Sequence, residues 1–296
     1  MSGYPFGSAD SAENSTIPDD AIVKHFLIAG GDGKGKTSVL KLLAHRQIEL
    51  NRQLIVLDQS GQLFDNVVKC GVAAHLTAEH VVVIDTTERE RIVCINPLAN
   101  TAILPETLAS RLTATVMTGF LREGLSVSDV EVMQAMGGID DLAALIAEPE
   151  SYAHYSLSGR NRPSLDFRAI LSQGIHVVAK VTRAERSYLY GLLLANELLT
   201  AVDRREPGEP LLVLMDGILP FLTPGVANLH PYLTSRNVAL VVVGSYQELA
   251  YLKREERPLY DTVLHHFGGH ISFGANDDDP EDIVRDLAAR NMNLSP

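Results

Sequence analysis

Short runs of β-branched and other apolar residues alternate with longer helical patterns along most of this chain. The apolar runs predict strands over 25–29, 54–57, 81–84, 175–181, 211–215, 238–243 and 270–273. The intervening patterns predict helices over 37–51, 183–203, 246–255 and 280–289. Several of the strands are apolar at every position, as strands are when helices cover both faces of a parallel sheet. The pattern therefore predicts an α/β fold with a central, mostly parallel sheet flanked by helices.

Two segments lack this alternation. Residues 1–20 are rich in Ser, Gly, Asp and Asn, so we expect a disordered N-terminal tail there. Residues 105–163 have a helical pattern without strands and end in a polar stretch rich in turn-forming residues. We therefore expect one α/β domain over 21–104 and 164–296, interrupted by a helical insertion and linker.

The composition is that of an ordinary globular chain, because 46% of the 296 residues are hydrophobic and 21% are charged. These fractions exclude wholesale disorder and the collagen-like and coiled-coil classes. The chain carries 25 Lys and Arg against 37 Asp and Glu, a formal net charge of −12. It therefore has no global positive field that attracts nucleic acid or anionic lipid, and any contact with nucleic acid has to be local.

Cysteine content and hydropathy bear on where the protein works. Cys70 and Cys94 cannot form a disulfide framework for a chain of this length, which favours a reducing cytosol. The first residues lack the basic stretch and apolar run of a signal peptide. The longest apolar runs fall far short of the roughly 20 residues that a membrane helix needs. We expect a cytoplasmic protein without direct membrane insertion.

Residues 30–37 read GGDGKGKT, which satisfies the phosphate-binding motif G-x-x-x-x-G-K-[ST]. The motif follows one predicted strand and precedes a predicted helix, the order that such a site requires. Successive backbone N–H groups of this turn can surround a phosphate, and the helix N-terminus adds partial positive charge. The alternative is a glycine-rich turn without a ligand, which the coincidence of motif and context disfavours.

The motif predicts a site for ATP and Mg²⁺. The expected nucleotide-binding residues are Gly30, Gly31, Asp32, Gly33, Lys34, Gly35, Lys36, Thr37 and Ser38. We expect Lys36 to meet the charge of the β- and γ-phosphates and the Thr37 hydroxyl to ligate Mg²⁺. Lys34 either contacts phosphate or stays in solvent, and Asp32 opposes phosphate binding unless it points outward.

The apolar run 211–215 ends in Asp216, the pattern of a Walker B strand whose carboxylate orders Mg²⁺. In many P-loop ATPases the next residue is a glutamate that aligns and deprotonates the attacking water. Here the next residue is Gly217, which has no side chain that could act as a base. Loss of a positioned general base costs about 10²–10⁴-fold in rate, so either another group does this work or hydrolysis is slow.

Two further aspartates follow predicted strands. Asp58 follows 54–57 and Asp85 follows 81–84, and open α/β sheets build their sites at the carboxyl ends of strands. We favour Asp58 as the missing catalytic carboxylate. The alternative for each aspartate is to cap the turn that follows its strand.

Gln247 and Arg236 flank the predicted strand 238–243. We expect the Gln247 amide to contact the γ-phosphate or orient water, and the alternative is an exposed glutamine at a helix start. Arg236 is a candidate arginine finger that acts on a neighbouring subunit, and the alternative is a solvated loop arginine.

The three histidines within 265–270 have no acidic partner nearby in sequence, so a polar cluster is favoured over a zinc site.

In their order, these motifs resemble the motor domain of conjugative coupling ATPases of type IV secretion, within the FtsK/HerA-like class of P-loop ATPases. Residues 25–37 resemble the first strand and phosphate loop of that family, and LIVLDQSGQLF at 54–64 is similar to its VxDPxGEL segment. Other similar segments follow in the family's order: Asn96-Pro97-Leu98, 166–181, the helix from Tyr188, Asp216, Arg236, Gln247-Glu248-Leu249 and 271–274.

The resemblance implies a RecA-like ATPase domain over about residues 22–290 that forms a hexameric ring and uses ATP to thread DNA or protein through its pore. DNA and secretion-machinery proteins are then the implied partners, and these partners would recruit the chain to the inner face of the membrane. The chain departs from the family at Gly217, in its lack of N-terminal membrane helices and in the small size of the predicted insertion.

Three functions remain open. The first is an ATP-driven translocase in which the residues named above hold MgATP and complete catalysis. The second is a hydrolysis-deficient adaptor or docking subunit that keeps ATP as a structural ligand, which Gly217 and the acidic net charge suggest. The third is a small-molecule P-loop kinase, for which we find no acceptor-binding signature.

Overall fold

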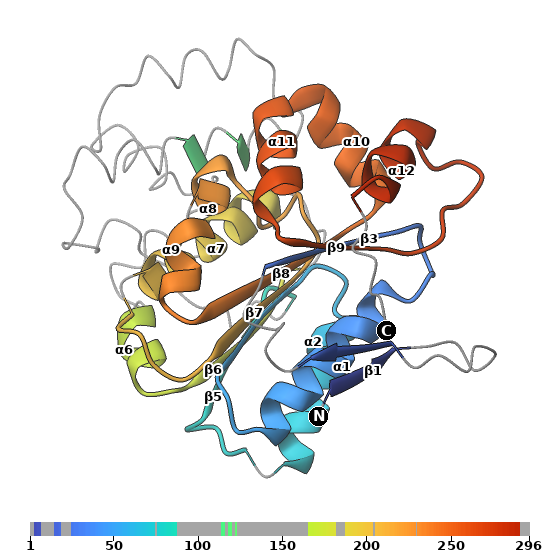
Figure 1. The fold of residues 1–296 in the computed structure, drawn as a ribbon. Helices are drawn as coiled ribbons and strands as arrows, with labels where there is room; N and C mark the ends of the chain where they lie inside the picture. The colour runs from blue at the N-terminus through green and yellow to red at the C-terminus, as the bar shows by residue number, and fades with distance from the viewer. Residues whose placement is uncertain are drawn as a thin grey trace.

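The computed structural model describes residues 3–6, 15–18, 25–74, 76–87, 114–115, 118–119, 122, 165–181, 187–203, 205–228 and 230–290. The central element is one seven-stranded sheet with the order β5-β6-β4-β7-β8-β3-β9, in which every neighbouring pair is parallel (Figure 1). Its strands are β3 (Phe26–Ala29), β4 (Leu54–Asp58), β5 (Val81–Asp85), β6 (His176–Lys180), β7 (Leu211–Asp216), β8 (Val238–Gly244) and β9 (Gly269–Ser272).

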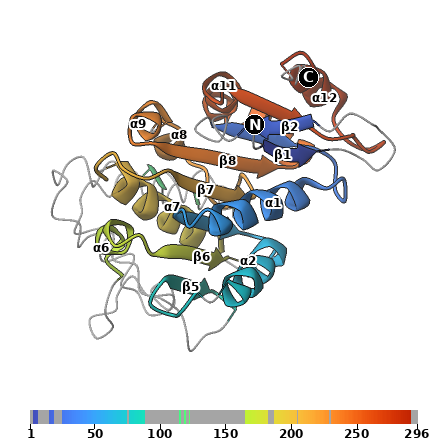
Figure 2. The same ribbon diagram turned by 60° about the horizontal axis from the view of Figure 1, so that its bottom comes forward.

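Helices pack on both faces of the sheet, which gives the domain three layers (Figure 1, Figure 2). One face is covered by α1 (Lys36–Glu49) and α2 (Gln62–Ala73). The other face is covered by α6 (Phe167–Ser172), α7 (Ser187–Asp203), α8 (Pro224–Asn228), α9 (His230–Ser235), α10 (Tyr246–Glu255), α11 (Arg257–His266) and α12 (Glu281–Ala288). Because β4 and β8 are buried at every position, their sequences are apolar on both faces.

The structure confirms the predicted α/β class and all seven predicted strands, each to within one residue at either end. It also confirms four predicted helices as α1, α7, α10 and α12. The described residues also contain five helices that the sequence pattern did not predict: α2, α6, α8, α9 and α11.

The N-terminal segment holds two strands that the expectation of a disordered tail did not include. β1 (Gly3–Phe6) and β2 (Ser15–Pro18) pair antiparallel with each other. The predicted insertion over 105–163 lies outside the described residues, except for 114–115, 118–119 and 122, which are helical. The bounds of that insertion therefore remain a prediction. In the described part of the chain, no helix combines the length and apolar character needed to cross a membrane.

The parallel arrangement places the functional segments at one edge of the sheet. The carboxyl ends of β4, β7 and β8 lie in register, since Asp58 pairs with Asp216 and Asp216 with Val243. Ala29, at the end of β3, pairs with Gly244 at the end of β8. The loops that follow these four strands therefore meet beside one another, where α/β sheets bind their ligands.

Candidate functional site

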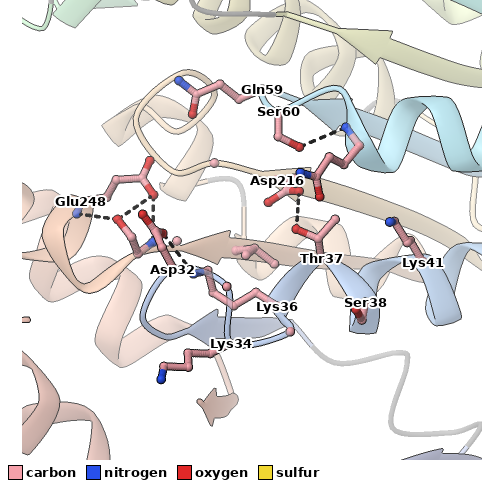
Figure 3. Close-up of a pocket in the computed structure, with 17 residues that line it drawn as sticks. Asp32, Lys34, Lys36, Thr37, Ser38, Lys41, Gln59, Ser60, Asp216 and Glu248 are labelled. Carbon is pink, nitrogen blue, oxygen red and sulfur yellow. Dashed lines mark hydrogen bonds and ion pairs between the residues drawn. The ribbon is translucent and has the colours of Figure 1, made fainter. Parts of the chain in front are cut away.

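A pocket of about 560 Å³ lies at this carboxyl edge of the sheet (Figure 3). The loops after β3, β4, β7 and β8 all contribute to its walls. The lining residues are 32–38, 41, 59, 60, 62, 216, 217, 243–245 and 248. The pocket therefore contains most of the predicted phosphate loop together with the predicted metal-ordering aspartate.

The phosphate loop turns from β3 into α1 through glycines. Gly33 and Gly35 have φ values of 76° and 99°, a region that glycine enters without the steric strain of a side chain. The Ser38 N–H donates to the Gly35 carbonyl at 3.0 Å as α1 begins. No side chain caps the helix at Gly35, so the N–H groups of Lys36 and Thr37 at its start remain available beside the pocket. This arrangement is suited to binding an anion.

The Lys36 side chain is folded back under the phosphate loop. Its Nζ donates to the carbonyl oxygens of Gly30 at 2.7 Å and Gly31 at 2.9 Å, so these two predicted binding residues hold the lysine without lining the pocket themselves. Nζ also lies 3.7 Å from the Asp32 carboxylate. The Asp32 side chain is 94% exposed to solvent but lines the pocket beside this lysine, where its charge opposes phosphate binding. The loop thus carries a cation at the position where the motif predicts one.

Thr37 and Asp216 meet across the pocket, although 178 positions of sequence lie between them. The Thr37 hydroxyl donates to Asp216 Oδ2 at 3.1 Å (Figure 3). The pKa of Asp216 is raised from 3.8 to about 6, first because burial desolvates the carboxylate and then because the charges of Asp58 and Glu248 repel it, whereas Thr37 and Lys36 lower this pKa. The negative charge at this position is therefore poorly compensated by the protein alone.

The same contacts fit a magnesium ion. Hydroxyl and carboxylate oxygens are the ligands that Mg²⁺ prefers, and Thr37 and Asp216 bring one of each together. A buried carboxylate whose neighbours repel it gains more from a nearby cation than a solvated one does. The residues present are thus the ones that such an ion needs from the protein.

Glu248 lines the pocket and was not predicted as a site residue. Its Oε1 accepts hydrogen bonds from the N–H groups of Ile218 at 3.1 Å and Leu219 at 3.3 Å. Its Oε2 accepts from the N–H of Ser245 at 2.9 Å, as half of a capping box at the start of α10. The sequence signal was the spacing S-x-x-E. Glu248 therefore holds the loop after β7 against the loop after β8.

Arg122 holds the loop after β7 from its other side. Its guanidinium pairs with both carboxylate oxygens of Glu256, at 2.7 and 2.8 Å, and its side chain is 1% exposed. It also donates to the carbonyl oxygens of Leu219 and, at 2.9 Å, of Leu222. The peptide groups on either side of Leu219 are thus fixed by Glu248 through an N–H and by Arg122 through a C=O.

The backbone conformation and the close neighbours of Gly217 favour a glycine at this position. It has a φ of 125°, and a Cβ added there would lie 2.9 Å from Gln59 Oε1 and 3.0 Å from Pro220. Gly244, at the end of β8, is equally restricted, because a Cβ there would lie 2.2 Å from the Ile218 side chain. The spaces that side chains would take at these two strand ends are filled by other residues, so neither position can project a base into the pocket.

The structure does not bring Asp58 into the pocket lining. Asp58 is fully buried, and its Oδ1 accepts from the N–H of Ser60 at 2.8 Å and from the Ser60 hydroxyl. Its Oδ2 accepts from the Phe64 N–H at 2.8 Å, in the first turn of α2. These contacts match the turn-capping alternative. Asp85 makes the same kind of contact, with Thr87 at 2.8 Å.

Gln247 and Arg236 also lie outside the pocket lining. The exposed Gln247 side chain donates to the Asp278 carbonyl at 2.9 Å, which matches the helix-start alternative. Arg236 precedes β8, so it lies at the opposite end of that strand from the pocket. It cannot contact the pocket of its own chain from there.

Among the described residues, no group of three or more His, Cys, Asp or Glu forms a metal site, and the zinc alternative has no support in them.

No family model and no curated protein sequence matches this chain. Solved structures do match. The bacterial conjugative coupling protein TrwB, in its unbound monoclinic form, is similar with a TM-score of 0.61 and 13% identity, over 90% of this chain and 72% of that one. VirB4 of Thermoanaerobacter pseudethanolicus is similar with a TM-score of 0.58 and 14% identity, over 97% and 87%.

TrwB in complex with ADP and Mg²⁺ is also similar, with a TM-score of 0.60 and 14% identity, over 94% of this chain and 77% of that one. Similarity at this level of identity shows a shared fold. The chain thus shares its α/β fold with TrwB and VirB4, with the phosphate-loop motif between β3 and α1. The resemblance that the motifs predicted is confirmed as a resemblance of fold.

Proposed function

We propose that this chain binds MgATP in the pocket and hydrolyses it, as the motor subunit of a ring that moves DNA or protein. The observation that carries the proposal is the contact between Thr37 and Asp216, at 3.1 Å, beside a phosphate loop that holds Lys36. In this proposal the N–H groups of the loop and of the first turn of α1 bind the phosphates. TrwB, which has this fold, has been solved with ADP and Mg²⁺.

Three side chains, those of Lys36, Thr37 and Asp216, have distinct roles in the proposed binding. Lys36 exchanges its two carbonyl acceptors, Gly30 and Gly31, for phosphate oxygens, a stronger charge-assisted contact. Thr37 and Asp216 hold Mg²⁺ through one hydroxyl and one carboxylate. When bound, the ion neutralises charge that develops between the β- and γ-phosphates.

The wider parts of the proposal concern assembly. We assign the chain to a hexameric ring in the cytoplasm, with DNA and proteins of a secretion machinery as its partners at the inner face of the membrane. Because Arg236 lies at the far end of β8 from its own pocket, it can act as an arginine finger only on the nucleotide of a neighbouring subunit. Arg236→Ala should then lower turnover only in the assembled ring.

The experiment compares ATP turnover of the wild type and Lys36→Ala, with and without single- and double-stranded DNA. We expect Lys36→Ala to lower turnover by about 10²-fold or more, because a charge that stabilises the transferred phosphoryl group is lost. Lys69→Ala, at an exposed position of α2, is the matched control and should keep the wild-type rate. Identical rates for the wild type and Lys36→Ala under all conditions would overturn the proposal.

A second function, a hydrolysis-deficient adaptor, is favoured by one observation. The side-chain spaces at Gly217 and Gly244 are filled by Gln59, Pro220 and Ile218, so no base projects from either strand end. An adaptor of this kind is stabilised by ATP through mass action but releases no phosphate. Thermal unfolding with ATP and Mg²⁺, combined with a phosphate-release assay, separates the two functions.

A further inference from the structure

Gln59 occupies the place of the side chain that position 217 lacks. Its Oε1 lies 2.9 Å from where a Cβ on Gly217 would be, and it lines the pocket. Its backbone N–H donates to the Asp216 carbonyl at 3.1 Å, which fixes the start of this side chain beside the predicted metal site. Figure 3 shows Gln59 and the phosphate loop on opposite sides of Asp216.

The Nε2 group of Gln59 is not used by the described part of the fold. Its Nε2 is buried and has no hydrogen-bond partner among the described residues. A buried donor without a partner destabilises the folded state, and such groups in folded proteins call for an explanation. The other described side chains with such an atom are Gln47, Gln53, Thr200 and His270, and none of them lines the pocket. Gln59 thus combines an Nε2 donor that has no partner among the described residues with a position in the pocket.

We infer that Gln59 is the water-positioning residue of this site, an inference that rests on the hydrolysis proposed above. Its amide holds the attacking water in line with the γ-phosphate, as a glutamine does in other P-loop enzymes. Held there, the water oxygen forms the new bond to the γ-phosphorus while the bond from phosphorus to the β,γ-bridging oxygen breaks. An amide cannot take the proton of the water, so this proton leaves with the released phosphate. In this proposal Gln59 orients the attacking water in place of a side chain at position 217, but it does not replace the general base.

Gln59→Met tests this inference, because methionine keeps the length of glutamine and removes the amide. Gln59→Met should lower kcat by about 10²-fold, since positioning of the reacting atoms is lost, and leave KM for ATP near its wild-type value. It should also stabilise the protein slightly, because an unpaired buried amide disappears. Gln59→Glu supplies a carboxylate at the same place and should keep kcat at or above the wild-type value.

Gln53→Met is the matched control at the opposite end of β4. The Gln53 Nε2 donates to the carbonyls of Leu171 at 3.3 Å and Ile175 at 2.9 Å, so this variant should lose stability and keep kcat. The inference is supported if Gln59→Met loses kcat and gains stability, while Gln53→Met keeps kcat and loses stability. An unchanged kcat in Gln59→Met, or equal losses of kcat in both variants, would overturn it while leaving the proposed hydrolysis intact. A wild type that binds ATP but releases no phosphate, with DNA present, would overturn both.

Discussion

The buried carboxylate of Asp216 should make the ligand-free protein less stable at neutral pH than a variant without that charge. Asp216→Asn keeps the shape of the side chain and an oxygen that can accept the hydrogen bond from Thr37. Because the pKa of Asp216 is higher in the folded chain, at about 6, than its unfolded value of 3.8, the stability that the protonated carboxyl contributes is complete below 3.8. This contribution is lost as the pH rises through about 6.

The size of the effect follows from the pKa values. A difference of about two pKa units corresponds to about 3 kcal/mol in the free energy of unfolding once the pH exceeds both values. Asp216→Asn should therefore exceed the wild type in stability by about 3 kcal/mol at pH 7.5 and by about half of that at pH 5. The same variant should bind Mg²⁺ and ATP together more weakly, because an anionic ligand of the metal is lost.

The assay is urea unfolding of ligand-free protein between pH 5 and pH 8, with the wild type, Asp216→Asn and Asp277→Asn. Asp277 lies in an exposed turn and serves as the control for removing one negative charge. If Asp216→Asn is no more stable than the wild type at any pH, or if its advantage grows as the pH falls, the reasoning about this carboxylate is refuted.

Two further substitutions test the loop after β7. Gly217→Ala should lower the free energy of unfolding by about 2 kcal/mol, because φ is 125° and the new Cβ would press on Gln59, and equal chemical denaturation curves would contradict this. Arg122→Ala should cost about 3 kcal/mol in the same measurement, since Glu256 and two carbonyl oxygens lose a buried partner. An Arg122→Ala variant as stable as the wild type would mean that this ion pair is not formed.

Much of the fold could be predicted because the strands are apolar runs and the phosphate loop is a local motif. The strands β4 and β8 are buried at every position, so their sequences are runs of apolar residues that can be recognised without the structure. The helix α2 was missed because Gly71 and several β-branched residues weaken its helical pattern, and packing against the sheet determines its conformation. The short helices α6, α8 and α9 offer too few turns for a periodic signal.

The candidate site was predictable only where the residues themselves define the chemistry. Lys36, Thr37 and Asp216 were found from motifs whose spacing fixes their positions, and the structure brings them together. Asp58 and Gln247 were chosen because they follow strands, but the sequence does not say which way a side chain at a strand end turns. Asp58 turns toward backbone N–H groups of the segment that follows it, and Gln247 turns toward the Asp278 carbonyl in the loop after β9. Gln59 was not predicted, since its position depends on the missing Cβ of Gly217.

The place of β3 in the sheet has a consequence for how the site comes into being. This strand pairs only with β8 and β9, which are formed by Val238–Gly244 and Gly269–Ser272. A nascent chain leaving the ribosome therefore exposes the GGDGKGKT segment long before any neighbouring strand exists to hold it. Closing contacts of such long sequence separation is slow. A fragment that ends before Val238 would keep the residues of the motif but lack both strands that hold β3 and the phosphate loop in place.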